Sequence, residues 1–160
     1  MARPVIATKL YVPRPRPGLV PRPRLLERLR RGAEARLTLV SAPAGFGKST
    51  LLAAWLGERA VVAPEGSAAT PAAMSAETQP VAWVSLDRRD RDPASFWTYV
   101  LNAIRNAAPE TGENALAQLE QDAAATQPAL TTLVNELAQV ERGLTIVLDD
   151  YHHVDTCREL

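Results

Sequence analysis

Hydrophobic and polar positions along the chain form two kinds of pattern, short apolar runs and longer segments with helical spacing. The runs are RLTLVS, VAWVSLD and LTIVLDD, at residues 36–41, 81–87 and 144–150. Elsewhere, apolar residues recur every three or four positions, as on one face of a helix. Strands that are apolar throughout and alternate with helices are typical of a parallel sheet covered on both faces. The pattern therefore predicts an α/β fold with a three-layer αβα arrangement.

Five amphipathic segments are predicted to form helices, at residues 24–35, 48–59, 93–108, 113–124 and 128–141. Asp92 and Pro93 mark the start of the third, because Asp is a favoured N-cap residue and Pro fits the first helical position. Gly32 and Gly57 are expected to end the first two.

Three stretches lack such periodicity. Residues 1–23 hold six of the thirteen prolines and are expected to be extended. Residues 60–80, rich in Ala, Pro, Ser, Thr and Gly, are predicted to be a flexible loop. Residues 88–92, RRDRD, are predicted to be a solvated loop that caps the next helix. The expected organisation is an arm with a short helix at 1–35, followed by a core at 36–160.

Composition indicates one soluble domain with unevenly distributed charge. The chain has 160 residues, 46% hydrophobic and 22% charged, and a single cysteine. No apolar run is long enough to span a membrane and no signal peptide is evident, so we expect a cytoplasmic protein without a membrane partner. Residues 1–36 hold ten basic and two acidic residues, against eight and sixteen in the remainder. The basic residues alternate with proline and lack interleaved aromatic residues, which favours a solvated arm over nucleic-acid contact.

The sequence APAGFGKS at residues 42–49 matches the phosphate-binding loop G-x-x-x-x-G-K-[ST], with Ala42 at the first position. Such a loop needs glycine where the backbone dihedrals are unusual, so that N–H groups turn toward a phosphate at the start of the next helix. Pro43 has no N–H, so phosphate binding must rely on the amides that follow it. The residues expected to supply them are Ala44, Gly45, Phe46 and Gly47.

Three further residues complete the predicted loop. The chain has only two lysines, Lys9 and Lys48, and a compact ammonium group suits the outer phosphates better than the broad fork of Arg. The Ser49 hydroxyl is expected to bind Mg²⁺, and Thr50 can contact the inner phosphate. An apolar run enters the loop and an amphipathic segment leaves it, which favours a nucleotide site over a simple Gly-rich turn.

A pair of carboxylates, Asp149 and Asp150, ends the last apolar run. In P-loop nucleotide-hydrolysing proteins, a strand of this kind supplies the second half of the site. Asp149 is then expected to hold Mg²⁺, and Asp150 to act as the catalytic residue that polarises the attacking water. The alternative is an acidic strand end with no chemical role.

Four ordered segments resemble one family: TKLYVPRPRPGLVPRPRLLERL, VSAPAGFGKSTLLAAWL, VAWVSLDRRDRDPASFWTYVLNAI and LTIVLDDYHHVD. Together they are similar to the N-terminal ATPase module of MalT-like regulators, the large ATP-binding members of the LuxR family of bacterial transcription factors. The resemblance spans residues 5–155 and implies a P-loop fold of the signal-transduction ATPase class. Members of that class switch between a closed ADP form and an ATP-bound oligomer, so ATP, Mg²⁺ and self-association are implied.

The resemblance also assigns residues to the nucleotide. In this class a Val-x-Arg stretch before the first helix lies against the adenine, and Val20 and Arg22 occupy that place. Lys48, Ser49 and Asp149 correspond to the phosphate and magnesium residues, and Asp150 to the second acidic position.

The chain departs from the family in its extent. It stops shortly after the Asp pair, before the helix-turn-helix domain of these regulators, so no direct DNA contact is expected from it. In this class another strand lies between the Asp-pair strand and the phosphate-loop strand, and here it would fall beyond residue 160. We therefore expect an incomplete sheet and no efficient ATP hydrolysis by this chain alone.

Three functional hypotheses remain open. The first is an ATP-binding switch module of a MalT-like regulator. The second is a small stand-alone P-loop ATPase or kinase, with the clustered Arg88, Arg89 and Arg91 as catalytic candidates. The third is a truncated fragment that binds no nucleotide or only contacts a partner.

Overall fold

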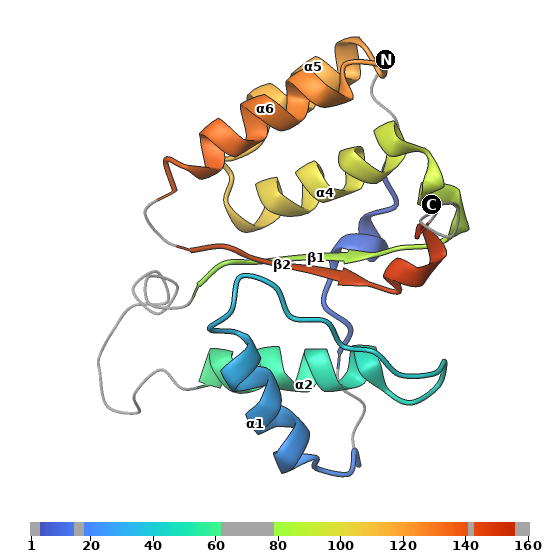
Figure 1. Ribbon diagram of the computed structural model, residues 1–160, viewed down its shortest axis with the longest axis vertical. Coiled ribbons are helices and arrows are strands. Elements are labelled where there is room, and N and C mark those ends of the chain that lie inside the picture. Colours follow the sequence, from blue (N-terminus) through green and yellow to red (C-terminus); the bar gives the residue numbers. More distant parts are fainter. Residues whose placement is uncertain (1–3, 15–17, 62–78, 141–142, 156–160) are drawn as a thin grey trace. The chain divides into compact units, whose positions relative to one another are not determined.

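The computed structural model describes residues 4–14, 18–61, 79–140 and 143–155, and it shows a mixed α/β protein (Figure 1). Short 3₁₀ helices are labelled η. In chain order the elements are η1 (Ala7–Leu10), α1 (Pro23–Gly32), α2 (Lys48–Val61), β1 (Val81–Ser85), η2 (Arg88–Arg91), α4 (Pro93–Ala107), α5 (Glu113–Gln121), α6 (Thr126–Leu137), β2 (Thr145–Asp149) and η3 (Tyr151–His153).

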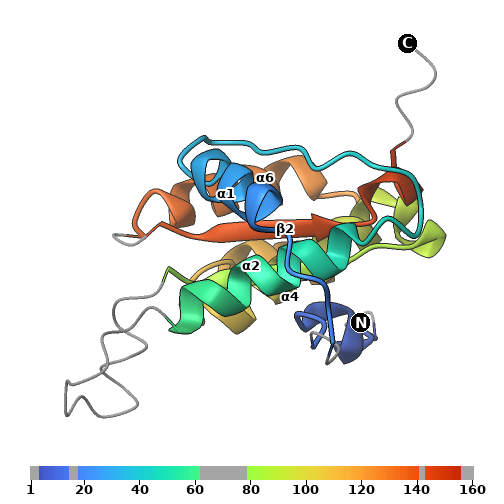
Figure 2. The same ribbon diagram turned by 90° about the horizontal axis from the view of Figure 1, so that it is seen from below.

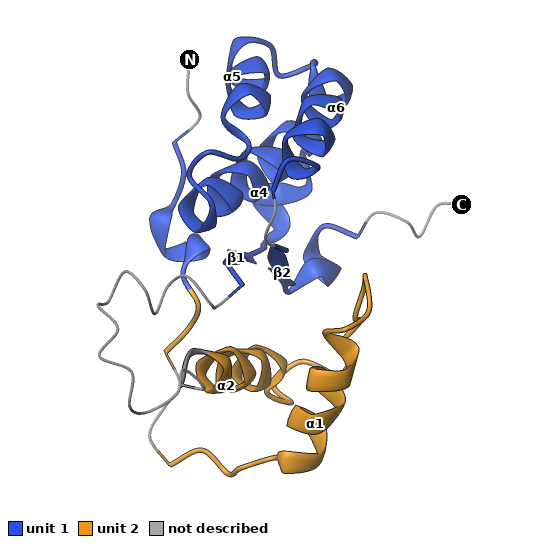
Figure 3. Ribbon diagram, turned by 90° about the vertical axis from the view of Figure 1, so that its left-hand side faces the viewer, with its two compact units in different colours: residues 1–11, 79–160 blue, residues 12–78 orange. Residues whose placement is uncertain are grey.

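The chain divides into two compact units (Figure 3). Unit 1 consists of Met1–Tyr11 and Gln79–Leu160, and unit 2 is Val12–Thr78, inserted between these two parts. Unit 1 contains both strands with α4, α5 and α6, whereas unit 2 contains α1 and α2. The predicted domain boundary at residue 35 concerns a different division of the chain and stays a prediction.

Unit 1 is built on a parallel pair of strands. β1 pairs with β2 in a register that sets Val81 opposite Thr145 and Ser85 opposite Asp149. Parallel strands need a crossover connection, because the chain must return to the end of the sheet where β1 began before β2 can start. The helices α4, α5 and α6 form this crossover and lie on one side of the strand pair (Figure 1).

The core of unit 1 lies between β1 and these helices. Alternate residues of β1 and its continuation, Ala82, Val84 and Leu86, belong to one apolar cluster with buried residues of the crossover helices. From α4 the cluster includes Leu101 and Ile104, which are 1% and 0% exposed. Each such side chain contributes about 2 kcal/mol by leaving water. This burial explains why the apolar face of α4 packs on the sheet.

The start of α4 confirms the prediction made from Asp92 and Pro93. Asp92 is the N-cap, and its Oδ2 accepts a hydrogen bond of 2.9 Å from the backbone N–H of Ser95. Pro93 occupies the first turn, where no intrahelical N–H bond is lost. The local sequence therefore accounts for the position of this helix end.

Unit 2 contains a helix pair. α1 contacts α2 and buries Leu26 and Leu29. Arg30 of α1 donates to Glu58 of α2, with 2.8 Å between Nη2 and Oε2, and also to Glu27 on its own helix. α1 ends at Gly32 as predicted, but α2 continues past Gly57, so the prediction of a helix end at Gly57 is wrong.

The predicted strand at residues 36–41 is not formed. Leu37 and Leu39 are 86% and 85% exposed, and the segment pairs with no strand in the described part of the chain. Figure 2 shows the chain between α1 and α2 as an extended segment. A strand exists only where a neighbouring strand satisfies its backbone N–H and C=O groups, and no such neighbour pairs with residues 36–41 among the described residues. The apolar sequence of residues 36–41 alone is therefore not sufficient to form a strand.

Two further expectations concern loops and spans. Most of the predicted flexible loop at 60–80 lies outside the described residues, which resume at Gln79. No helix in the described ranges is long and apolar enough to cross a membrane.

The segment RRDRD after β1 is exposed and caps α4 as predicted, with one exception: Asp90 is 1% exposed and therefore not solvated. Its carboxylate binds Lys9 from the N-terminal segment, with Lys9 Nζ 2.9 Å from Oδ1 and 2.7 Å from Oδ2. Lys9 Nζ also lies 2.9 Å from Asp87 Oδ2 and 4.6 Å from the ring centroid of Tyr99. The prediction failed for Asp90 because its partner lies 81 positions away in sequence.

This ionic cluster, Lys9 with Asp87 and Asp90, shifts two pKa values. Partial burial alone lowers the pKa of Lys9, but the hydrogen bonds to Asp90 and Asp87 outweigh it and hold the pKa above its ordinary 10.5. The hydrogen bond from Lys9, followed by that from the backbone of Arg89, holds the pKa of Asp87 below its ordinary 3.8. Both shifts favour the charged forms in the folded protein.

We predict that Lys9→Met lowers the free energy of unfolding by about 3 kcal/mol, because it leaves the buried Asp90 carboxylate without its cation. Urea denaturation followed by far-UV circular dichroism measures the change. Arg36→Met, at an exposed position, is the matched control and should change stability by less than about 0.5 kcal/mol. Equal stability of Lys9→Met and the control would contradict this role for Lys9.

The pKa of Asp87 predicts a pH dependence. A carboxyl whose folded pKa is lowered contributes stability above its unfolded pKa, and this is lost as the pH falls through the lowered value. Stability should therefore decline as the pH falls below about 4. Lys9→Met removes the largest cause of the shift, so its decline over this range should be smaller. Urea midpoints of both proteins at several acidic pH values test the difference, and parallel curves would refute the link.

Candidate functional site

The loop before α2 contains two glycines in the left-handed region of backbone conformation. Gly45 and Gly47 have φ angles of 81° and 78°, a region in which a Cβ is strained. A Cβ at Gly45 would meet no atom within 4 Å, so the dihedral angle and not crowding makes glycine the suitable residue. α2 then starts at Lys48, so its N-terminus directly follows this turn.

Lys48 folds back over the loop that precedes it. Its Nζ donates to the carbonyl oxygen of Ala42 at 2.9 Å and to that of Pro43 at 3.3 Å. The side chain is half-buried, whereas Ala42 and Pro43 are exposed. The ammonium group is thus held at the loop, where it would add positive charge to the N-terminus of α2.

Arg22 also reaches this loop. Its Nη1 donates to the carbonyl oxygen of Phe46 at 3.1 Å, and Nη1 and Nη2 lie 3.9 and 4.0 Å from the position of a Cβ on Gly47. Val20, the other arm residue assigned to the nucleotide, is 80% exposed. Sequence reasoning placed Arg22 near the site but missed its contact with the loop.

The remaining predicted loop residues are accessible to different degrees. Phe46 is 63% exposed, and Ala44 and Thr50 are also exposed. Ser49 is half-buried in the first turn of α2. The structure therefore brings residues 42–50 together with Arg22 within unit 2.

The predicted carboxylate pair lies in unit 1, at the carboxyl end of β2. Asp149 is the last residue of the strand and 6% exposed. Asp150 has a φ of 55°, the one positive value among the described non-glycine residues, and its backbone N–H donates to Asp149 Oδ1 at 3.1 Å. His152 Nδ1 lies 3.8 Å from Asp150 Oδ1.

A contact between two turns at this edge was not predicted. Arg91 in η2 donates from Nε to the carbonyl oxygen of His153 in η3, at 2.8 Å. The bond joins the turn after β1 to the turn after β2, and both lie at the carboxyl ends of parallel strands. In open α/β sheets, ligands bind at this edge.

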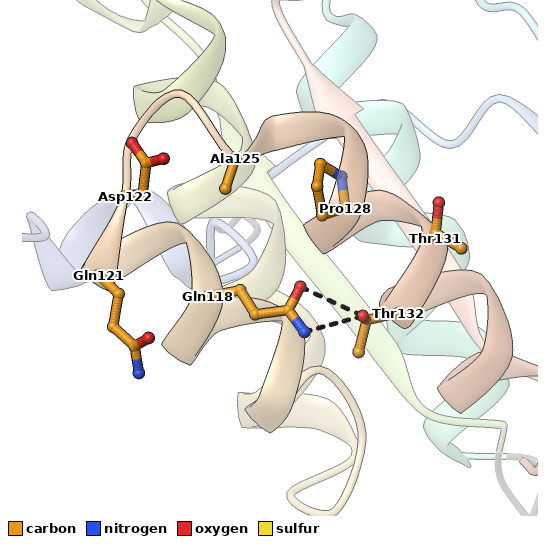
Figure 4. Close-up of a pocket in the computed structure, with 7 residues that line it drawn as sticks. All are labelled: Gln118, Gln121, Asp122, Ala125, Pro128, Thr131 and Thr132. Carbon is orange, nitrogen blue, oxygen red and sulfur yellow. Dashed lines mark hydrogen bonds between the residues drawn. The ribbon is translucent and has the colours of Figure 1, made fainter.

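A groove between α5 and α6 is the alternative location for a site (Figure 4). Across it, Gln118 and Thr132 exchange hydrogen bonds of 3.0 and 3.2 Å, so these polar groups satisfy each other. Asp122 supplies a carboxylate to the lining, which contains no basic residue. We assign no anion-binding role to this groove.

The two predicted halves of the site offer different chemical groups. The loop offers backbone N–H groups, the Lys48 ammonium and the start of a helix, which together suit an anion such as a phosphate. The end of β2 offers carboxylate oxygens, the ligand type that Mg²⁺ prefers.

Comparisons relate the chain to parts of larger bacterial proteins. It is 35% identical over 156 residues to the serine/threonine-protein kinase PknK of Mycobacterium tuberculosis (strain H37Rv), covering 97% of this chain and 13% of PknK. PknK of Mycobacterium bovis gives the same values. The HTH-type transcriptional regulator MalT of Yersinia enterocolitica is 34% identical over 149 residues, covering 92% of this chain and 14% of MalT. No family model matches the chain.

The chain therefore spans less than a sixth of the length of these relatives. Because the similarity covers nearly all of this chain, it concerns a module that occurs in proteins with different names and activities. The activities in those names belong to the whole relatives.

We predict opposite effects for two Gly→Ala changes that lie ten positions apart. Gly47→Ala should lower the free energy of unfolding by about 1 kcal/mol, because Ala is strained at positive φ. Gly57→Ala, in the interior of α2 with no atom within 4 Å of the added Cβ, should raise it by up to about 1 kcal/mol. Urea denaturation measures both, and a stabilising Gly47→Ala would show that the loop does not hold this conformation.

Proposed function

We propose that this chain is the ATP-binding module of a MalT-like, LuxR-family bacterial transcription regulator, with a P-loop fold and a Mg²⁺-dependent site. The observation that carries the proposal is the loop at 42–50. It places two glycines at positive φ and Lys48 at the first residue of a helix.

The residues of the loop fit the triphosphate of ATP. The backbone amides of residues 44–47 follow a turn in which Gly45 and Gly47 have left-handed φ angles, as in anion-binding concavities. Lys48 is bound to the neutral carbonyl oxygens of Ala42 and Pro43, and a phosphate oxygen is a stronger acceptor for the same ammonium group. Thr50, exposed in the first turn of α2, can contact the inner phosphate.

Mg²⁺ would be held by the Ser49 hydroxyl and the Asp149 carboxylate, and it would neutralise charge on the phosphates. In this proposal Asp150 orients the attacking water, and Val20 and Arg22 bind the adenine end. Asp150 departs from the strand at positive φ, and such strained residues are frequent at functional sites.

The role proposed for ATP is that of a switch and not of metabolic turnover. The similarity to MalT, which is named a transcriptional regulator, supports this role, and the similarity to PknK supports a module used in more than one protein. The proposal includes a closed ADP form, ATP-dependent self-association and a cytoplasmic location. DNA contact is assigned to other parts of a full regulator and not to these residues.

One observation favours a second candidate, a stand-alone ATPase or kinase. Arg88, Arg89 and Arg91 are exposed in η2, at the carboxyl end of β1 beside the paired β2. A guanidinium there could stabilise a transferred phosphoryl group. Phosphoryl transfer from radiolabelled ATP to a small acceptor, abolished by Arg89→Ala, would favour this candidate. The third hypothesis, a fragment without nucleotide binding, predicts no response to ATP at all.

We predict that Mg²⁺–ATP raises the melting temperature of the chain, because a ligand that binds only the folded state stabilises it by mass action. At a ligand concentration of about a hundred times Kd, the gain is about 2.7 kcal/mol. Lys48→Ala should abolish most of the shift while leaving the melting temperature without ligand nearly unchanged. Differential scanning calorimetry with and without Mg²⁺–ATP measures both quantities.

Two controls separate the parts of the site. Asp149→Asn should reduce the shift seen with Mg²⁺–ATP and leave the smaller effect of ATP with EDTA unchanged. Arg36→Met, at an exposed position outside both motifs, should behave as wild type. A shift of equal size in wild type and Lys48→Ala would disprove the assignment of the phosphate loop, and no shift in wild type would favour the fragment hypothesis.

A further inference from the structure

We propose that Arg22 is a positioning residue for the phosphate loop. Its guanidinium group holds the peptide unit between Phe46 and Gly47 in the orientation that turns the Gly47 N–H toward a bound phosphate. This inference rests on the proposed function, but it concerns the shape of the loop before any nucleotide binds.

The contact is directed at one peptide unit. Arg22 Nη1 donates to the carbonyl oxygen of Phe46 at 3.1 Å, and both terminal nitrogens lie about 4 Å from the Cβ position of Gly47. The guanidinium group therefore lies across the Phe46–Gly47 peptide. Gly47 has a φ of 78°, so this peptide is part of the left-handed turn itself.

Peptide geometry gives the contact its consequence. In a planar trans peptide, the C=O of one residue and the N–H of the next point in opposite directions. A donor that fixes the Phe46 carbonyl on one side of the loop therefore fixes the Gly47 N–H on the other side. Glycine has more conformational freedom than any other residue. The hydrogen bond therefore excludes other orientations of the Phe46–Gly47 peptide that the glycine would otherwise permit.

The backbone of Arg22 is fixed by hydrogen bonds at the start of α1. Arg22 is the N-cap of α1, and its carbonyl oxygen accepts hydrogen bonds from the N–H groups of Leu25 and Leu26 at 3.0 and 3.1 Å. α1 in turn contacts α2 and is joined to it by the Arg30–Glu58 ion pair at 2.8 Å. α2 begins at the end of the loop, and the loop contacts Arg22, which lies at the start of α1. α1, α2 and the loop are therefore each connected to the other two. The side chain is thus fixed at both ends.

Contact with the adenine, which the proposed function also assigns to Arg22, and simple attraction of phosphate charge are two roles that do not require positioning of the loop. If Arg22 acts through the adenine, as the resemblance implies, its loss should not affect a ligand that lacks a base. If it only attracts the phosphate charge, its loss should not change the loop of the nucleotide-free protein. If Arg22 positions the peptide, its loss should both weaken a ligand that lacks a base and change the loop of the nucleotide-free protein.

The first experiment observes the loop without nucleotide. The chain has eight glycines, so labelling with ¹⁵N-glycine gives a simple amide spectrum, in which Gly47→Ala identifies the Gly47 signal. Arg22→Met should shift this signal and lower its heteronuclear Overhauser effect, while the Gly57 signal in α2 stays unchanged. Arg28→Met, also exposed on α1, is the matched control. An unchanged Gly47 signal in Arg22→Met would overturn the proposal.

The second experiment compares ATP with inorganic tripolyphosphate, both with Mg²⁺, by isothermal titration calorimetry. Arg22→Met should weaken both ligands by about tenfold, the size expected for loss of one charge-assisted hydrogen bond. Arg22→Lys should recover most of the affinity, because one N–H donor to one carbonyl suffices and no bidentate pairing is involved. A loss confined to ATP would mean that Arg22 contacts the base, and would also overturn the proposal.

The outcome for Lys48→Ala keeps the inference distinct from the proposed function. If wild type binds both ligands, Lys48→Ala binds neither, and Arg22→Met equals wild type, the nucleotide site stands and the role of Arg22 fails. If wild type binds neither ligand, the proposed function itself fails.

Discussion

The parallel pairing of β1 with β2 is the constraint on which unit 1 depends. Because the strands run in the same direction, the residues between Ser85 and Thr145 must cross from one end of the pair to the other. The crossover supplies the helices that cover one face, and the apolar side chains of β1 find their partners there. The same constraint sets the ends of both strands at one edge, so Asp149 lies opposite Ser85. The position of the predicted carboxylates is therefore a result of strand topology and not of any special property of the acidic residues.

The second constraint concerns the N-terminal segment of unit 1, which is separated in sequence from the rest of that unit. The chain leaves unit 1 after Tyr11 and returns at Gln79. Lys9 lies just before the first of these points, where the buried Asp90 and the ring of Tyr99 bind it. Burying a carboxylate is costly unless a cation and further hydrogen bonds compensate, and Asp90 has both, since its Oδ2 also accepts from the N–H of Asp87. The two lysines of the chain thus have different partners, carboxylates for Lys9 in unit 1 and backbone carbonyl oxygens for Lys48 in unit 2.

The sequence predicted those elements whose cause is local. Asp92 and Pro93 define the start of α4, and Gly45, Gly47 and Lys48 shape the loop, because these residues act on backbone within six positions of themselves. The strand at 36–41 was not predictable in this way, since pairing depends on a neighbour and Leu37 and Leu39 find none among the described residues. The burial of Asp90 and the contact of Arg22 with Phe46 were missed for the same reason. Each depends on a partner that is 24 or 81 positions distant in sequence, where no short pattern reveals it.

The place of Lys9 also affects how the chain assembles during synthesis. Residues 4–11 leave the ribosome before the whole of unit 2, yet Asp87, Asp90 and Tyr99 follow only after it. α1 and α2 can form their pair while this early segment still lacks its partners, because domains form as their residues emerge. Closing the contact from Lys9 to Asp90 then joins the ends of a long loop, and the entropic cost of such closure grows only slowly with length. The contact made by the segment that is synthesised first can therefore be completed only after all of unit 2 has been synthesised.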